Sequence, residues 1–323
     1  MLRSIYRLMV IFCLHMSYGQ AMAASDYPAK PIKMYIGFSA GSATDIVGRI
    51  VAEGLATRLK QPVVVENKVG AGGSIAAQDT ARAPSDGYTL LMVSSAIAVN
   101  PAVYKNARKV ISELRPIALV GYLPTVLLAS SQMPVKNLSE FIDYTKKHPD
   151  AVNFGSSGVG GSTHMAMEAF SRAKGIDLVH IPYKGNGQAS AALIGNQIDA
   201  YMDTILLAAP VVASGRAKGM AVSGANRSPL IPNVPTFAEA GAPEYNSSLF
   251  FGVMGPAGIS ENLVRQLNDE INAVLRTPAI KERLSKTGGL TLSNGSAADF
   301  DQTLRKELAL WQQVGEDVGI KPQ

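Results

Sequence analysis

The feature that most constrains the fold is a regular alternation of short apolar runs with amphipathic, helix-like segments. Lys33 to Phe38 has the character of a buried strand, and from Asp45 apolar residues recur at helical spacing. Val63 to Val65 is a second strand. A strand, a helix and a strand in this order favour parallel pairing with the helix packed on the sheet. The sequence therefore predicts an α/β protein with mainly parallel sheets flanked by helices.

The same alternation continues along the chain. Further strands are predicted at 88–93, 116–120, 125–129, 152–155, 178–181, 198–202, 217–222 and 249–254, and further helices at 74–82, 138–147, 163–174, 188–194, 205–214, 263–275 and 296–311. The adjacent strands 116–120 and 125–129 are separated by only four residues, so we place a crossing between two domains there. Strand 249–254 is then the return crossing. This organisation predicts a discontinuous first domain (24–122 and 250–323), an inserted second domain (123–249) and a cleft between them.

The first 23 residues have the layout of a cleaved secretory signal peptide. Arg3 and Arg7 precede the apolar run from Leu8 to Leu14, and Ala21-Met22-Ala23 supplies the small residues of a cleavage site. The apolar run is far shorter than the roughly 18 residues of a membrane-spanning helix. Cleavage also removes Cys13, the single cysteine, which excludes a disulfide, a cysteine metal site or a cysteine nucleophile in the mature protein. The predicted location is the periplasm.

Composition excludes two classes of function. Charged residues make up 17% and hydrophobic residues 47% of the 323 residues, which is incompatible with an intrinsically disordered chain. The 30 Lys and Arg residues exceed the 25 Asp and Glu residues by only five, and no run of five or more like charges occurs. We therefore expect no nucleic-acid partner.

Motifs for catalysis and for cofactors are almost absent. No phosphate-binding loop, dinucleotide fingerprint, zinc-protease motif or nucleophile elbow occurs, and His148, His164 and His180 lack metal-binding spacing. One competing pattern is Ser171-Arg172-Ala173-Lys174 followed by Lys286-Thr287-Gly288, a pair found in serine penicillin-recognising enzymes. In those enzymes the first motif opens a helix, whereas here it closes one. We predict no catalytic residue, no metal and no cofactor, with a secreted serine hydrolase as the alternative.

Two loops of small residues are the remaining candidates for a site. Ser39-Ala40-Gly41-Ser42-Ala43-Thr44 links the first strand to its helix, and residues 155–163 occupy the same position in the second domain. N–H groups at a helix start have no partner within the helix, and that end carries about half a positive charge, so it attracts carboxylates and phosphates. An ordinary tight turn with an N-cap hydroxyl explains either loop taken alone. Two such loops on opposite sides of a cleft favour a receptor for a small anion.

Seven strings in this order resemble a known family. They are YPAKPIKMYIGFSAGSATD, VENKVGAGGSIAA, PSDGYTLLM, GSSGVGGSTHMAMEAF, HIPYKGNGQASAALIGNQID, PNVPTFAEAG and FGVMGPAG. Together they resemble the solute-binding proteins of tripartite tricarboxylate transporters, the Bug family, over nearly all of the mature chain. The resemblance implies a periplasmic two-domain Venus-flytrap fold and a monomer. It also implies capture of a small carboxylate (a di- or tricarboxylate, an acidic amino acid or an aromatic carboxylate) and its delivery to inner-membrane permease subunits.

The resemblance further implies which residues contact the ligand. The first ligand loop of the family corresponds to Phe38–Asp45 and the second to Gly155–His164. The implied contacts are Phe38, Ser39, Ala40, Gly41, Ser42, Ala43 and Asp45 in the first loop, Ser156, Ser157, Gly158 and Thr163 in the second, and Ser94 and Ser95 after the third strand.

Four further positions carry open alternatives under this resemblance. His164 either bonds the ligand or packs at the start of its helix, and Tyr183 and Lys184 close over the ligand or remain solvated. Asp203 repels an anion unless the ligand also carries an ammonium group, or the carboxyl is protonated or turned away. A solute sensor acting on a signalling partner is an alternative to transport.

Overall fold

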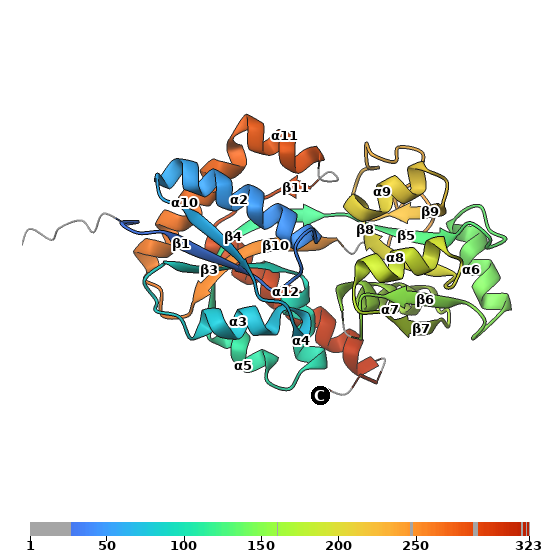
Figure 1. The fold of residues 1–323 in the computed structure, drawn as a ribbon. Helices are drawn as coiled ribbons and strands as arrows, with labels where there is room; N and C mark the ends of the chain where they lie inside the picture. The colour runs from blue at the N-terminus through green and yellow to red at the C-terminus, as the bar shows by residue number, and fades with distance from the viewer. Residues whose placement is uncertain are drawn as a thin grey trace, which may run out of the picture.

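The computed structural model describes residues 27–159, 161–245, 248–286, 290–317, 319, 320 and 322. The predicted signal peptide, residues 1–23, lies outside this range. The described chain forms two lobes side by side, each built on one sheet (Figure 1). We call them the first lobe, which contains β1–β4, β10 and β11, and the second lobe, which contains β5–β9.

The first lobe is a six-stranded sheet in the order β11-β4-β10-β3-β1-β2. Its strands are β1 (Ile32–Ile36), β2 (Val63–Asn67), β3 (Thr89–Ser94), β4 (Leu114–Leu123), β10 (Leu249–Pro256) and β11 (Thr291–Leu292). Its helices are α2 (Ala43–Leu59), α3 (Ser74–Ala81), α4 (Ala96–Val103), α5 (Ala107–Ser112), α10 (Glu261–Arg276), α11 (Pro278–Lys286) and α12 (Ala297–Asp317), with a short 3₁₀ turn at Ala71–Gly73. Strands β3 and β10 are buried along their whole length because helices cover both faces of the sheet.

The second lobe is a five-stranded sheet in the order β7-β6-β8-β5-β9. Its strands are β5 (Thr125–Ser130), β6 (Asn153–Ser156), β7 (Val179–Pro182), β8 (Ala200–Thr204) and β9 (Ala217–Val222). Its helices are α6 (Leu138–Lys147), α7 (Ser162–Lys174), α8 (Asn186–Ile194) and α9 (Ile205–Ala213). Only Pro124 separates β4 from β5, so the chain passes directly from one sheet to the other.

Both sheets are mixed, which corrects the expectation of mainly parallel sheets. Parallel pairing is confined to β1 with β2 and β3, and to β6 with β7 and β8. Strand β10 is antiparallel to β3 and β4, and β5 is antiparallel to β8 and β9. The cause is that β10, which returns from the second lobe, lies between β3 and β4, and β5, which enters from the first lobe, lies between β8 and β9.

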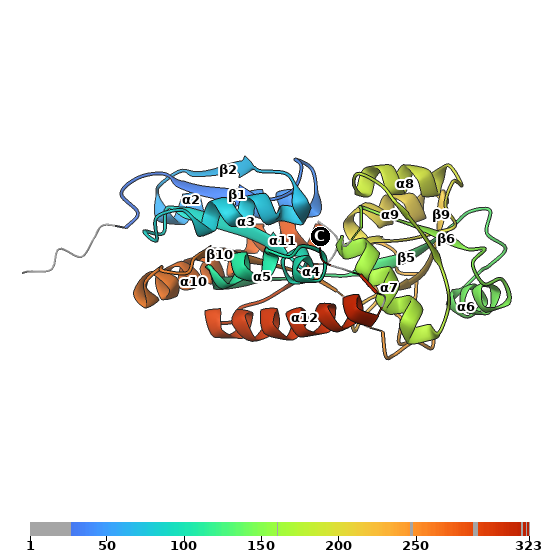
Figure 2. The same ribbon diagram turned by 90° about the horizontal axis from the view of Figure 1, so that it is seen from below.

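The lobes also touch outside the connecting strands. Met165 of α7 packs in a core cluster whose other buried members, such as Ile97 and Phe250, belong to the first lobe. Arg172 of α7 forms an ion pair with Asp317 of α12 at 2.8 Å. Helices α7 and α12 therefore meet at the boundary between the lobes (Figure 2).

Three helices, α4, α5 and α11, were not predicted from the sequence. Within the described residues, no helix is both long and apolar enough to cross a bilayer.

Candidate functional site

The first loop, residues 37–45, joins the carboxyl end of β1 to α2. Ser42 is the N-cap of α2: its Oγ accepts the N–H of Asp45 at 3.3 Å, and its own N–H donates to Ser39 O at 3.1 Å. The first intrahelical bond runs from Ile46 N to Ser42 O. Among the described residues no acceptor is found for the N–H groups of Ala43 and Thr44, so these donors remain available to an anion.

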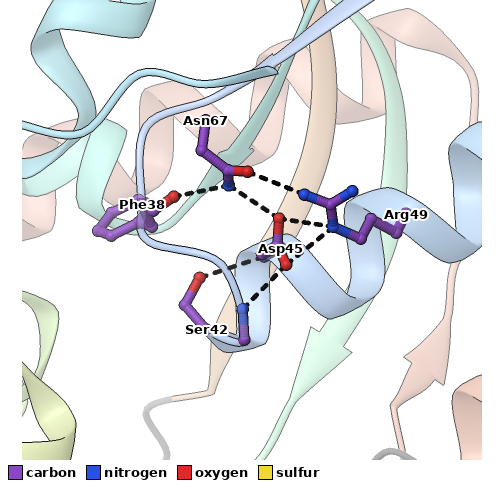
Figure 3. A network of polar contacts seen from close by, with 6 residues as sticks. Phe38, Ser42, Asp45, Arg49 and Asn67 are labelled. Atoms are coloured by element: carbon purple, nitrogen blue, oxygen red, sulfur yellow. Dashed lines mark hydrogen bonds and ion pairs between the residues drawn. The ribbon is translucent and has the colours of Figure 1, made fainter. Parts of the chain in front are cut away.

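Asp45 lies at the end of the first loop and holds the loop together through hydrogen bonds to its carboxylate (Figure 3). Its carboxylate, 3% exposed, accepts Arg49 Nε at 3.0 Å, Asn67 Nδ2 at 2.8 Å and the N–H of Gly41 at 2.9 Å. Asn67 Nδ2 also donates to Phe38 O at 2.9 Å. Burial alone would raise the pKa of Asp45, but the hydrogen bonds from Arg49, Asn67 and Gly41 outweigh it and hold the pKa below its ordinary value. The structure thus directs Asp45 at its own loop.

The 3₁₀ turn Ala71–Gly73 packs against the first loop. A Cβ on Gly37 would lie 2.4 Å from the Cα of Gly73, so the two backbones approach this closely only because residue 37 is glycine. Asn100 of α4 fixes the turn by donating to Gly72 O at 3.1 Å and to Ser74 Oγ at 3.0 Å. The backbone position of the first loop is therefore set by contacts from three separate segments.

The second loop, residues 155–163, joins the carboxyl end of β6 to α7. Thr163 Oγ1 accepts the N–H of Ser157 at 2.9 Å, and the N–H of Gly158 donates to Ser156 Oγ at 3.0 Å. Gly161 is the N-cap of α7 and provides no side-chain cap, and no acidic residue lies in the first turn. Within the described part of this loop, the N–H groups of Ser162 and Thr163 have no protein acceptor.

A stack of rings supports the second loop. His180 of β7 stacks on His164 at 3.8 Å between centroids and on Phe154 at 4.9 Å, and its Nε2 lies 2.6 Å from Ser156 Oγ. Burial, and then the proximity of His164, lowers the pKa of His180 to about 3, so its ring is neutral at neutral pH. His164 is buried, and its Nε2 lies 3.5 Å from Glu168 Oε1. This places His164 in the packing at the start of α7.

Ser94 and Ser95 lie at the end of β3, beside the first loop. Ser94 pairs with Phe251 of β10, and Ser95 Oγ accepts the N–H of Phe250 at 2.7 Å. Both serines are buried. Ser95 therefore fastens the end of β3 to β10.

Three predicted residues gather around the start of α8. Tyr183 N donates to Ser156 O at 3.0 Å, which ties the segment after β7 to the second loop. Lys184 is exposed, and its N–H donates to Gln188 Oε1 at 3.2 Å. Asp203, at the end of β8, is completely buried and accepts Asn186 Nδ2 at 3.1 Å.

Neither of two cavities joins the two loops. One of about 10 Å³ lies against the first loop, between Gly37, Phe38, Gly73 and Ser94. The other, of about 970 Å³, is lined by α7, α12 and residues 224–229, among them Arg172, Arg227 and Trp311. The first loop and the start of α7 nevertheless lie on the sides of the lobes that face each other (Figures 1 and 2).

The competing Ser–Lys pattern has no catalytic geometry. Ser171 and Lys174 close α7, and Lys174 Nζ lies 2.5 Å from Glu244 Oε1 and 3.2 Å from Gly241 O. Ser171 Oγ is buried without a hydrogen-bond partner among the described residues. Thr287 and Gly288 of the second motif lie outside the described residues. In the described part of the chain, no group of three or more His, Cys, Asp or Glu side chains is arranged to hold a metal ion.

The sequence profile described as tripartite tricarboxylate transporter family receptor matches residues 47–320. The chain belongs to this family. Protein BugT of Bordetella pertussis is 34% identical over 317 residues, covering 96% of both chains. The family consists of solute receptors, so the chain is a binding protein and not an enzyme.

Solved structures of family members share the fold. The periplasmic binding protein BugD has a TM-score of 0.81 at 31% identity, over 92% of this chain and 100% of that one. MatC of Rhodopseudomonas palustris, solved with bound malate, has a TM-score of 0.79 at 30% identity, over 90% and 100%. A further R. palustris protein, solved with adipate, has a TM-score of 0.82 at 28% identity, over 92% and 100%. The two-lobed receptor fold expected from the sequence is therefore confirmed.

Several residues that hold the two loops and Asp203 in place were not identified from the sequence. They are Arg49, Asn67, Asn100, His180 and Asn186. Asn67 had a signal, because it ends β2, and carboxyl ends of neighbouring parallel strands lie at the same edge of a sheet. The others depend on which helices and strands become neighbours.

Proposed function

We propose that this receptor binds a small carboxylate between the first and second loops, in the periplasm, and delivers it to the permease subunits of a tripartite transporter. The first domain (24–122 and 250–323) and the second domain (123–249) close around the ligand, and the receptor acts as a monomer. The family assignment and the malate and adipate bound to two relatives support this class of ligand.

The observation that carries the proposal is the pair of open helix starts. The N–H groups of Ala43 and Thr44 begin α2, those of Ser162 and Thr163 begin α7, and the two helices start on the facing sides of the lobes. Each hydrogen bond to a carboxylate contributes about 1.5–3 kcal/mol. Three or four of them account for the roughly 8 kcal/mol of micromolar binding. No lysine is needed, which fits an exposed Lys184 whose backbone already bonds Gln188.

The test is calorimetric titration of the protein lacking residues 1–23 with succinate, malate, adipate, citrate and glutamate. At least one is expected to bind with micromolar or tighter affinity. Ser42→Ala removes the N-cap hydroxyl of the first loop, and Ser260→Ala removes a matched hydroxyl that caps α10 with the same 3.3 Å bond. Both variants should lose about 1 kcal/mol of stability. Only Ser42→Ala should weaken binding, by roughly tenfold.

Two results would contradict the proposal. If no carboxylate of the panel binds, the ligand class is wrong. If a carboxylate binds with equal affinity to Ser42→Ala and Ser260→Ala, the binding site lies away from the first loop.

A further inference from the structure

Asp203 is a buried carboxyl at the same sheet edge as the second loop. Strands β6 and β8 are parallel neighbours with Gly155 opposite Tyr201, so their carboxyl ends lie at the same edge of the sheet. Asp203 is the penultimate residue of β8 and is 0% exposed. Through Asn186 it is joined to the start of α8, which follows the Tyr183–Lys184 segment.

Only one oxygen of the Asp203 carboxyl has partners at normal hydrogen-bond geometry. Its Oδ1 accepts the N–H of Thr204 at 2.7 Å and Asn186 Nδ2 at 3.1 Å. Its Oδ2 has no partner of normal hydrogen-bond geometry among the described residues, and neither have Tyr201 Oη and Thr204 Oγ1 next to it. The cross-strand residue on β5 is Val126. No Lys, Arg or His in the described chain forms an ion pair with Asp203.

A buried negative charge with no cationic partner acts over several ångströms, because the surrounding protein screens it poorly. We propose that Asp203 is a specificity-determining residue of the carboxylate site: it disfavours a second negative charge at this edge and favours a ligand with an ammonium or hydroxyl donor there. This inference rests on the proposed function. The preferred ligands are then short dicarboxylates that carry an amino or hydroxyl group.

The selectivity should depend on pH. Burial raises the pKa of Asp203 to about 7 despite the hydrogen bonds from Thr204 and Asn186, so the carboxyl ionises across the neutral range. Burial, and then the charge of Asp203, raises the pKa of Tyr201, so this phenol stays uncharged there. On β7, on the far side of β6, the pKa of His180 is about 3, so its ring is neutral as well. His164 is the remaining titratable ring beside the second loop, so it needs its own control.

The experiment compares three ligands with one four-carbon skeleton: succinate, L-malate and L-aspartate, which carry hydrogen, hydroxyl and ammonium at the second carbon. Dissociation constants are measured at pH 6 and pH 8.5. At pH 8.5 aspartate and malate should bind at least roughly tenfold more tightly than succinate, and this ratio should shrink at pH 6 as Asp203 takes up a proton. The same pH change in the ratio is expected in His164→Gln.

Asp203→Asn keeps the shape of the side chain but removes its charge, so the preference over succinate should fall by roughly tenfold. Asp199→Asn is the matched control, because Asp199 precedes the same strand and its Oδ2 accepts Asn153 N at 2.9 Å at the opposite end. The wild-type pH comparison tests the inference even if Asp203→Asn does not fold.

Several outcomes would overturn the inference. An unchanged ligand order in Asp203→Asn, or an aspartate-to-succinate ratio independent of pH, removes the role of Asp203 while leaving carboxylate binding intact. If wild-type protein binds adipate or citrate but none of the three four-carbon ligands, the inference also fails. The proposed function fails only if every carboxylate in the larger panel fails to bind.

Discussion

The first and second loops are built alike, each leading from a strand end into a helix start, but they are stabilised in different ways. The first loop contains its own acid, Asp45, whose carboxylate is surrounded by Arg49, Asn67 and Gly41. The second loop contains no acid and no side-chain cap, and it is held by hydroxyl groups and by the neutral ring of His180. The start of α2 is therefore partly neutralised from within, whereas the positive end of α7 is not.

This difference assigns separate roles to the two lobes. The Asp45 network makes the first loop a rigid template, because its hydrogen bonds join three segments of the first lobe. The second loop contains no acid, so the start of α7 keeps its electrostatic attraction for an anion. The same helix carries Met165 and Arg172 against the first lobe, so this helix start belongs to the helix on which the lobes meet.

The largest effect is expected from removing the charge of Asp45, whose hydrogen bonds hold the first loop in place. Asp45→Asn replaces an oxygen that accepts the Gly41 N–H and the Arg49 Nε with an amide nitrogen that donates. We expect a loss of about 3 kcal/mol in the free energy of unfolding, measured by urea denaturation, because several buried bonds to a charged group are lost together. The folded pKa of Asp45 is below its ordinary value, so this stabilisation is present above about pH 4 and is lost as pH falls through the folded pKa.

A matched pair of variants separates this network from an ordinary helical ion pair. Asp301 and Arg305 have the same four-residue spacing and a 2.7 Å contact, but both side chains are exposed on α12. Asp301→Asn should cost less than about 0.5 kcal/mol. Equal losses in the free energy of unfolding in Asp45→Asn and Asp301→Asn would show that the Asp45 carboxylate does not hold the first loop in place.

The second loop can be tested by giving it the acid it lacks. Ser162→Asp places a carboxylate at the first residue of α7, where it should stabilise the fold by about 0.3–1 kcal/mol through the helix dipole. The same charge should compete with the ligand and weaken carboxylate binding by roughly thirtyfold, or about 2 kcal/mol. Thermal denaturation and calorimetric titration measure the two effects.

Ser162→Asn is the control, since it adds a similar polar group without charge. It should weaken binding far less than Ser162→Asp does. If Ser162→Asp binds as tightly as Ser162→Asn, the ligand carboxylate does not lie at the start of α7.

Features that depend on residues close together in the sequence could be predicted. A hydroxyl followed three residues later by Asp45 indicates a capped helix start, and Ser42 does cap α2. Two strands at 116–120 and 125–129 were also predicted with four residues between them, and the structure has β4 and β5 there with only Pro124 between them. These features depend on residues within a few positions of each other.

Side-chain contacts and strand pairings between segments far apart in the sequence could not be predicted. Asn67 lies 22 residues from Asp45, and His180 lies 24 residues from Ser156, so their contacts depend on strand order. Alternating strands and helices also suggest parallel pairing everywhere, although β10 returns antiparallel. Helix α4 was not predicted because seven of its eight residues are buried, so no polar face marks it as a helix.

The smallest effect concerns the pH range over which each loop is stable. The pKa of folded His180 is about 3 against an ordinary 6.5, so the folded protein binds fewer protons than the unfolded chain between these values. The contribution of His180 to the free energy of unfolding is present above pH 6.5 and is lost as the pH falls toward 3. This loss begins at a higher pH than the loss of the Asp45 contribution, which begins near pH 4. His180→Gln should flatten the fall in stability between pH 6.5 and 4 by less than about 1 kcal/mol, because the ring is partly exposed. His148→Gln, at a histidine that contacts Tyr144 on α6 instead, should leave the slope unchanged in the same urea titrations. Equal slopes in wild type and His180→Gln would mean that the second loop is not held by a neutral ring.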